Sequence, residues 1–382
     1  MNRPSARPDR ALERVYATSQ ELRIDDNARI VIFSDLHMGN GSWTDDFLHN
    51  GEMFREVLAR RYYEDDSTLI LNGDVEELQR FSRRSIAERW QSLYALFRAF
   101  HQEGRLIRIV GNHDLANLGD MDCFGSEEPR EGVTLNCKGN RLFILHGHQP
   151  LWKYERFNRW IGYVLKYLLN PLKIKNRTVA HNSRKRFVTE KRVYEFARSR
   201  GLLAIIGHTH RPLFESLSKV DVLRFEIEQR CQEYPTAPKA RRLAIRTEID
   251  RLQQELLHTN RNVKTEAARR SLYNADFVVP CLFNSGCVLG KRGMTALEIR
   301  GGRICLVHWF DALRNRNALR RHPSARNLTG TSYYRVVLKE DSLDYVFSRI
   351  GLLGGILLGT PSATEPAPVV HADAVAPGSE VA

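Results

Sequence analysis

The chain has 382 residues, of which 42% are hydrophobic and 27% charged, and its formal net charge is +13. These proportions are those of a globular protein, so they exclude a fibrous or wholly disordered chain and allow one α/β domain with an insertion. The six cysteines are scattered without a Cys-x-x-Cys pair. This spacing argues against a disulfide framework or a zinc knuckle and favours a reducing, cytoplasmic setting.

Neither export nor membrane insertion is indicated. Residues 1–28 are polar and rich in arginine, without the apolar stretch of a signal peptide, and we interpret them as an N-terminal extension. The two most apolar stretches, 161–172 and 350–358, are shorter than the roughly 20 residues that a membrane-spanning helix needs. We therefore expect no membrane-spanning helix.

Short apolar runs of strand length alternate with helical patterns along the first half of the chain. The runs are RIVIF at 29–33, TLIL at 68–71, RLIRIV at 105–110, LFIL at 142–145 and LLAII at 202–206. At 47–62 and 86–102, apolar residues recur every three or four positions, which predicts helices. This alternation is typical of an α/β fold with buried strands.

Most of the excess positive charge lies in residues 151–200. This segment has 14 basic and three acidic side chains, Glu155, Glu190 and Glu195, so its net charge is 14 minus 3, or +11. Eight aromatic residues are interleaved with the charges, and 154–168 has the spacing of an amphipathic helix. The segment predicts a surface for an anion with an apolar or stackable part. A solvated helix face is the alternative.

The second half of the chain is less regular. Residues 217–273 are charged and free of glycine, which predicts an inserted helical hairpin. Residues 277–309 return to strand patterns with glycine turns, and we expect them to form a second, antiparallel sheet. We place the end of the domain at 310 and interpret 311–382 as a C-terminal extension whose tail is disordered from about 359.

Side chains that can bind metal follow each of the five strand-like runs at once. They are Asp35 and His37 in SDLHMG, Asp74 in LNGDVEE, Asn112 and His113 in VGNHD, His146 and His148 in LHGH, and His208 and His210 in GHTH. In open α/β sheets, ligands bind beyond the carboxyl ends of the strands, so these side chains should converge on one place. One such pair alone is typical of a turn or cap. Five in strand order predict a binding site.

The mixture of carboxylate, imidazole and amide groups at these positions suits first-row divalent ions. We expect manganese, with iron or zinc as alternatives, and the absence of cysteine from the motifs argues against a structural zinc site. Two ions that share one carboxylate lie roughly 3.5–4 Å apart and stabilise both the attacking and the leaving oxygen of a phosphoryl transfer. The residues therefore predict a two-metal phosphoryl-transfer site.

The motif series Asp-x-His, Gly-Asp, Gly-Asn-His-Asp, His-Gly-x and Gly-His-x-His resembles that of the calcineurin-like metallophosphoesterases, over about residues 30–211. The resemblance implies a four-layer αββα sandwich. It also implies that one metal ion is bound by Asp35, His37 and His210, that the other is bound by Asn112, His146 and His208, and that Asp74 bridges them.

The same resemblance implies a mechanism. A hydroxide that bridges the two metal ions attacks the phosphorus of a phosphodiester, pyrophosphate or phosphomonoester, and His113 protonates the leaving oxygen. Asp114 or Glu77 would orient the His113 imidazole and keep it charged. We expect His148 and Arg211 to contact the substrate.

Within the family, the residues discriminate between substrates. Protein serine/threonine phosphatases continue the second motif as Gly-Asp-x-x-Asp-Arg-Gly, whereas this chain has GDVEELQ, which argues against that class. The SDLHMG, GDVEE and GHTHRP segments look more like those of UDP-2,3-diacylglucosamine pyrophosphatases, which have a basic helical lid where this chain has 151–200. The chain departs from them at His113, where they have arginine, and in the 217–273 insertion.

Two other functions fit the residues. A nuclease would use the basic and aromatic segment to bind a phosphate backbone. A non-catalytic binding module would use 217–273 to dock a protein partner, but the complete ligand set argues against it. We also expect peripheral contact of 151–200 with an anionic membrane surface, at the inner face of the membrane.

Overall fold

The computed structural model describes residues 9–114, 130–151, 183–215, 237–262 and 279–354, with a few further positions between 223 and 235. The amphipathic helix expected at 154–168 and the tail expected from about 359 lie outside the described residues.

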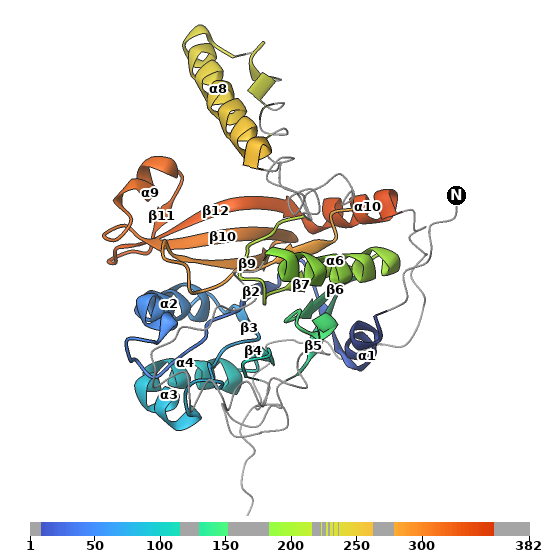
Figure 1. Cartoon of the computed structure of the whole chain (residues 1–382), viewed down its shortest axis with the longest axis vertical. Coiled ribbons are helices and arrows are strands. Elements are labelled where there is room, and N and C mark those ends of the chain that lie inside the picture. The colour runs from blue at the N-terminus through green and yellow to red at the C-terminus, as the bar shows by residue number, and fades with distance from the viewer. Residues whose placement is uncertain are drawn as a thin grey trace, which may run out of the picture.

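Two sheets form the centre of the molecule (Figure 1). The five-stranded sheet has the order β1 (Gln20–Ile24), β5 (Gly132–Cys137), β6 (Asn140–Leu145), β7 (Leu203–Ile206) and β8 (Leu282–Asn284). The seven-stranded sheet has the order β11 (Arg326–Asn327), β12 (Tyr333–Ser342), β10 (Arg303–Asp311), β9 (Met294–Arg300), β2 (Arg29–Phe33), β3 (Thr68–Asn72) and β4 (Leu106–Ile109). All five predicted strands are confirmed as β2, β3, β4, β6 and β7.

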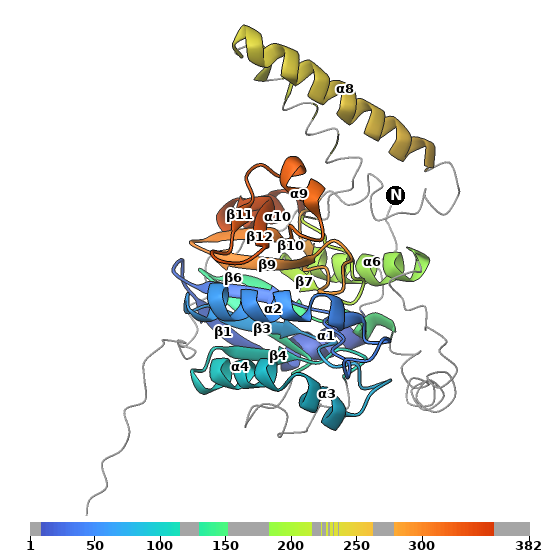
Figure 2. The ribbon, with the colours of Figure 1, turned by 90° about the vertical axis from the view of Figure 1, so that its left-hand side faces the viewer.

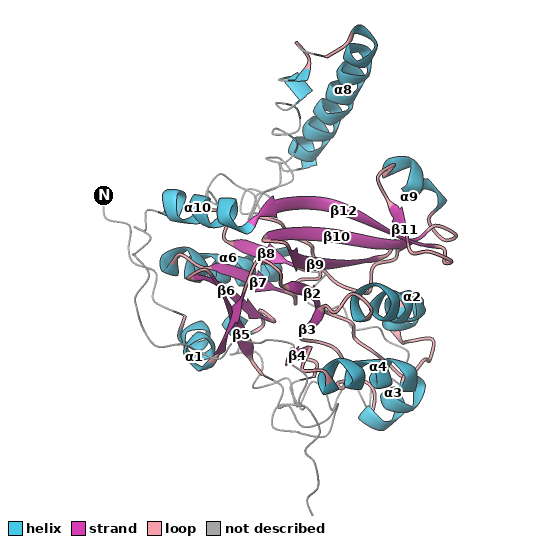
Figure 3. Ribbon diagram, turned by 180° about the vertical axis from the view of Figure 1, so that it is seen from behind, coloured by secondary structure: helices cyan, strands magenta, loops and turns pink. Residues whose placement is uncertain are grey.

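Helices cover both outer faces, as Figures 1 and 3 show, and complete the predicted αββα sandwich. Beside the seven-stranded sheet lie η1 (Asp46–His49), α2 (Gly51–Val57), η2 (Leu58–Tyr63), α3 (Arg83–Arg89) and α4 (Gln91–Gln102). On the other side lie α1 (Arg10–Thr18), η4 (Gln149–Leu151), α6 (Ser183–Arg200) and α10 (Leu343–Gly354), while α9 (Arg316–Arg321) follows β10. The helix predicted at 86–102 is divided at Trp90, where the backbone leaves helical geometry.

Strand β2 explains why these runs are apolar at consecutive positions. Val31 and Phe33 pack toward the helices beside the seven-stranded sheet, whereas Ile30 and Ile32 pack into the core between the sheets. A parallel strand that is buried on both faces needs apolar side chains at odd and at even positions alike. Because successive side chains point to opposite faces, this one strand contributes to two cores.

Residues 277–309 do not form the separate sheet that we expected from the sequence. Strand β8 pairs in parallel with β7 and extends the five-stranded sheet. The hairpin of β9 and β10 pairs instead with β2, antiparallel, and extends the other sheet. The expectation was wrong because local patterns give strands but not their partners. Strand β12, from beyond residue 310, pairs with β10.

The segment before β2 is also part of the fold. Helix α1 and strand β1 lie within the first 28 residues, and β1 pairs in parallel with β5.

Helix α8 (Lys239–Asn262), from the segment predicted to be a helical hairpin, lies apart from both sheets (Figure 2). The five cysteines that the structure describes are free. Among the described helices, none has the length and apolar character to span a membrane.

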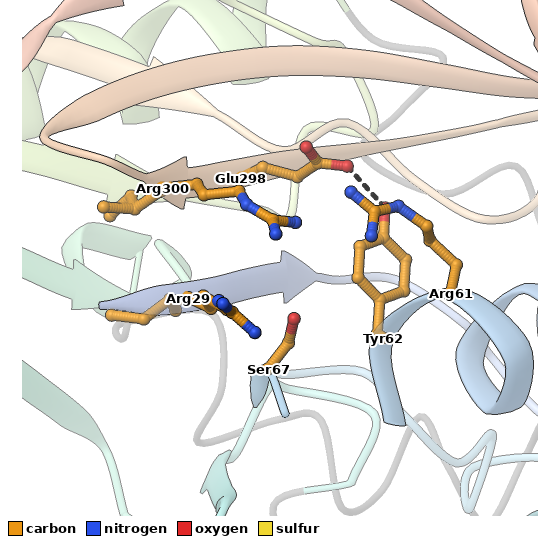
Figure 4. A pocket seen from close by; sticks show the side chains of 8 residues that line it. Arg29, Arg61, Tyr62, Ser67, Glu298 and Arg300 are labelled. Atoms are coloured by element: carbon orange, nitrogen blue, oxygen red, sulfur yellow. Dashed lines mark hydrogen bonds between the residues drawn. The ribbon is translucent and has the colours of Figure 1, made fainter. Parts of the chain in front are cut away.

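A buried polar network fixes the outer part of the seven-stranded sheet. Glu298 on β9 accepts hydrogen bonds from the Tyr62 hydroxyl at 2.7 Å and from Nε of Arg335 on β12 at 2.9 Å. Trp309 Nε1 donates to the Tyr62 oxygen at 3.0 Å. Figure 4 shows Tyr62 and Glu298 beside the neighbouring arginines. The network joins η2 to three strands through satisfied polar groups.

We predict that Arg335→Met lowers the free energy of unfolding by about 3–5 kcal/mol, because the Glu298 carboxylate would stay buried without its cation. Urea denaturation followed by circular dichroism measures this change. The matched control is Arg303→Met, which removes an exposed arginine of β10 that pairs with Glu340 of β12 in the same sheet. Equal losses in the two variants would contradict a special role for burial.

Candidate metal centre

The motif side chains meet where the carboxyl ends of strands from both sheets face each other. Asp35, His37 and His210 form one group, in which His210 Nε2 lies 3.1 Å from Asp35 Oδ1 and 3.2 Å from His37 Nε2. The first two follow β2 and the third follows β7. One group thus draws on both sheets.

A second group lies beside the first and shares a carboxylate with it. It consists of Asp74, His146 and His208. Oδ2 of Asp74 lies 3.2 Å from His146 Nε2 and 3.6 Å from His37 Nε2. Asp74 therefore stands between the two groups, as the sequence predicts for a bridging ligand.

The donor set fits two divalent cations. Two atoms that each lie about 2.1 Å from one ion are about 3.0–3.5 Å apart, which is the spacing of the close pairs given above. In addition, the buried side-chain atoms that make no hydrogen bond within the described residues include four atoms of predicted ligands: Asp35 Oδ1, Asn112 Oδ1, His146 Nε2 and His208 Nε2. Buried polar atoms without partners are unfavourable unless something else binds them, and metal ions would.

Backbone strain is concentrated at the same residues. Five of the predicted ligands have a left-handed backbone, with φ between 47° and 62°: Asp35, His37, Asp74, His208 and His210. For side chains other than glycine this conformation costs on the order of 1 kcal/mol or more each, and it persists only where the surroundings enforce it. Such strain is typical of functional sites.

Hydrogen bonds between the motifs enforce this geometry. The Asp35 and His37 amides donate to the carbonyls of Gly73 and Asp74, at 3.1 and 2.9 Å. The His208 amide donates to Oδ2 of Asp35 at 3.0 Å. The loops after β2, β3 and β7 therefore hold one another, rather than each being set by its own sequence.

Two motif glycines are needed for close approach. A Cβ atom at Gly73, whose φ is +81°, would lie 2.4 Å from Nδ1 of His146. At Gly111 it would lie 2.1 Å from Oδ1 of Asp74. Any side chain at either position would displace a ligand.

Hydrogen bonds also orient the imidazoles. Nδ1 of His37 lies 3.0 Å from Glu77 Oε2, and Nδ1 of His146 lies 2.8 Å from the Asn72 carbonyl oxygen. With Nδ1 engaged in each ring, Nε2 is the atom presented to a metal ion.

Glu77 is shared between a candidate ligand and the candidate acid. Its Oε1 lies 2.8 Å from Nδ1 of His113, whose amide also donates to Asp74 Oδ1 at 2.8 Å. Burial opposes a charge on His113, but the Glu77 and Asp74 carboxylates outweigh it and raise the pKa of His113 to about 9. Burial likewise opposes ionisation of Glu77, but His113 and His37 hold its pKa well below the usual range.

Asp114 does not have the contact with the His113 ring that the sequence allowed for either Asp114 or Glu77. Its carboxylate accepts the backbone amides of Val75 at 2.8 Å, Gly111 at 2.6 Å and Asp74 at 3.3 Å. Burial raises the pKa of Asp114 to about 6 against the influence of Arg108. Glu77 is thus the carboxylate in contact with the His113 ring, whereas Asp114 joins the second and third motif loops by accepting their backbone amides.

The two predicted substrate-binding residues border this cluster. His148 is buried, with its ring 5.6 Å from that of His146 and 6.4 Å from that of His208. Burial and these two histidines lower its pKa well below the usual value. Arg211 directly follows His210 and is partly exposed. Their contact with a substrate stays a prediction.

Sequence reasoning missed the residues behind the last motif. Thr209 Oγ1 donates to Glu190 Oε1 at 2.8 Å and accepts from Asn284 Nδ2 at 2.9 Å. From the sequence we considered Glu190 only as one of the three acidic residues of the basic segment 151–200. Its helical spacing with Val193, Tyr194 and Ala197 could have indicated that it lies on the buried face of α6.

Comparison with known families agrees with this geometry. Residues 28–212, which hold all the predicted ligands, match the family model for calcineurin-like phosphoesterases. This segment is a calcineurin-like phosphoesterase domain. The protein accordingly carries a metallophosphoesterase domain, and the resemblance seen in the motifs is confirmed at the level of the superfamily.

Solved structures give weaker likenesses. An uncharacterized protein of Streptococcus pneumoniae, described as a predicted phosphoesterase, has 12% identity and a TM-score of 0.29, with 81% of this chain and 97% of that chain covered. A Vps29 single mutant from Entamoeba histolytica has 10% identity and a TM-score of 0.29, with 81% and 99% covered. A mutant cold-active protein tyrosine phosphatase has 10% identity and a TM-score of 0.33, with 76% and 80% covered. Scores of this size carry no functional argument. No curated protein matches the chain.

We predict that Mn²⁺ raises the unfolding temperature of the protein and that EDTA reverses the increase, because an ion that binds only the folded state stabilises it. At 100 times the dissociation constant the gain is about 2.7 kcal/mol. Differential scanning calorimetry measures the shift. The Asp74→Asn variant should lose most of it, whereas Glu88→Gln, on the exposed surface of α3, should retain it. A full Mn²⁺ response in Asp74→Asn would contradict the bridging position.

Proposed function

We propose that this metallophosphoesterase hydrolyses phosphodiesters or pyrophosphates at a centre of two divalent metal ions. The observation that carries the proposal is the convergence of left-handed ligand backbones with buried ligand atoms that have no hydrogen-bond partner. A site that only stabilised the fold would satisfy these atoms within the protein.

Each ligand has a place in this proposal. Asp35, His37 and His210 would hold one ion, and His146 and His208, with Oδ1 of Asn112, would hold the other, while Asp74 would contact both. The ions would polarise the phosphoryl group and activate water for attack. Manganese suits this oxygen and nitrogen donor set, as do iron and zinc.

The chain's own groups would control the leaving group. The charged His113 imidazole, held by Glu77, would place a proton beside the site. Its backbone amide fixes Asp74, so the donor and the bridging carboxylate keep one relative position. A positioned acid of this kind contributes about 10²–10⁴-fold to a rate when the leaving oxygen is a poor one.

For the natural substrate we propose a lipid-linked nucleotide diphosphate. The GDVEE and GHTHRP segments support it through their resemblance to UDP-2,3-diacylglucosamine pyrophosphatases, as does the +11 charge of residues 151–200. Within that segment, α6 carries Lys191, Arg192 and Arg198 on its exposed face. A cationic surface beside a phosphoesterase site would attract a diphosphate or an anionic membrane surface.

We predict Mn²⁺-dependent hydrolysis of bis-p-nitrophenyl phosphate that falls by about 100-fold or more in Asp74→Asn, since even residues outside the ligand set change activity by 10–100-fold. Release of p-nitrophenolate measures the rate. Glu88→Gln serves again as the control. Equal rates in wild type and Asp74→Asn would overturn the two-metal proposal.

We predict that the loss of kcat in His113→Gln depends on the leaving group of the substrate. With p-nitrophenyl esters, whose leaving group needs little protonation, kcat should fall modestly. With phenyl esters it should fall by about 10²–10⁴-fold. Steady-state kinetics on both esters measures the ratio of the two effects. Equal losses on both esters would contradict a role for His113 as the acid and would indicate a positioning role instead.

A further inference from the structure

The last motif contributes one ligand to each metal group through a single short loop. His208 belongs to the group around His146, and His210 belongs to the group around Asp35. Both have left-handed backbones, with φ of 62° and 54°. Thr209, between them, is fully buried. The position of this one residue therefore affects both metal ions.

Side chains from two other elements hold Thr209. Its hydroxyl donates to Glu190 of α6 at 2.8 Å and accepts from Asn284 at the end of β8 at 2.9 Å. The same Asn284 amide donates to the Gly207 carbonyl at 2.9 Å, just before the loop. Asn284 Oδ1 in turn accepts the Gly286 amide at 2.8 Å, which fixes the orientation of the Asn284 side chain.

Glu190 is an unusual residue for this place. It is 1% exposed, and Thr209 is its hydrogen-bond partner in the structure. A buried carboxyl group is costly, and an apolar side chain would suit a helix face that also carries Val193 and Tyr194. Burial raises the pKa of Glu190 to about 7, and the hydrogen bond from Thr209 and the charges of Arg211 and Arg186 oppose the shift. Glutamine is thus a close substitute for its neutral form.

We propose that Glu190 is a positioning residue of the metal centre, which acts through Thr209 to hold His208 and His210 in their strained conformations. The inference rests on the proposed two-metal function and adds a residue of α6 to it. The hydrogen bond of Glu190 is to Thr209 and not to either of the two histidines. Its loss should therefore weaken the binding of both ions rather than remove one of them.

The test measures metal binding directly. Equilibrium dialysis with elemental analysis gives the number of Mn²⁺ ions bound, and isothermal titration calorimetry gives their dissociation constants. In Glu190→Leu and in Thr209→Val, which remove the two ends of the same hydrogen bond, we expect both ions to bind about 10–100-fold more weakly. Glu190→Gln should restore tight binding, since its amide oxygen can still accept from Thr209.

A neighbouring residue supplies the matched control. Thr189 is also fully buried on α6, and its hydroxyl makes no hydrogen bond. Thr189→Val should therefore leave Mn²⁺ binding unchanged, although it alters the same helix. Calorimetric unfolding of each metal-free variant shows that the fold is intact; Thr209→Val, which is isosteric, carries the test where Glu190→Leu is unstable.

The outcomes separate the two proposals. Wild-type Mn²⁺ affinity in folded Glu190→Leu and Thr209→Val would overturn the positioning role while leaving the two-metal centre in place. Weakening in Glu190→Gln as large as in Glu190→Leu would also overturn it, because the hydrogen bond would then not be the cause. A wild-type protein that binds no divalent ion would contradict the proposed function itself, and the positioning role with it.

Discussion

The structure depends on keeping several carboxylates and imidazoles, most of them buried, within a few ångströms of one another. Asp74 is the centre of this arrangement. Its Oδ1 accepts the His113 amide, and its Oδ2 lies between His37 and His146. Desolvation of a carboxylate is unfavourable, yet the surrounding histidines hold the pKa of Asp74 well below its usual value. Cations, whether protons on imidazoles or metal ions, are what make this cluster stable.

The two-sheet architecture provides the means of assembling such a cluster. Parallel strands of one sheet bring the first three motifs to a common edge, and β6 and β7 bring the last two from the other sheet. The loops after β2, β3, β6 and β7 each turn sharply through a left-handed residue, and hydrogen bonds join each of them to a loop from another strand. Because the strain in one loop is relieved by contacts with the next, the loops stabilise one another and the site forms as a unit.

The sequence predicted what is local and missed what is not. Strands β2, β3 and β4 are buried on both faces, so their apolar runs were readable, and the ligands follow them directly. The expectation that β8, β9 and β10 form one separate sheet was wrong, because a local strand pattern does not determine which sheet a strand extends. The choice between Asp114 and Glu77 needed side-chain direction, since both carboxylates lie near the motifs in sequence. Only the fold shows that Glu77 contacts His113 while Asp114 accepts backbone amides.

Helix α6 illustrates how one element can serve two demands. Its exposed face carries basic residues, whose charge acts over about 8–10 Å in physiological salt and does not require an exact position. Its buried face carries Glu190, whose effect requires a hydrogen bond of defined length to Thr209. An anion that interacts with the exposed face need not disturb the buried one, because the apolar residues of α6 are packed against the five-stranded sheet. The two proposed roles of α6, attraction of a charged substrate and positioning of the metal-binding loop, are therefore compatible in one helix.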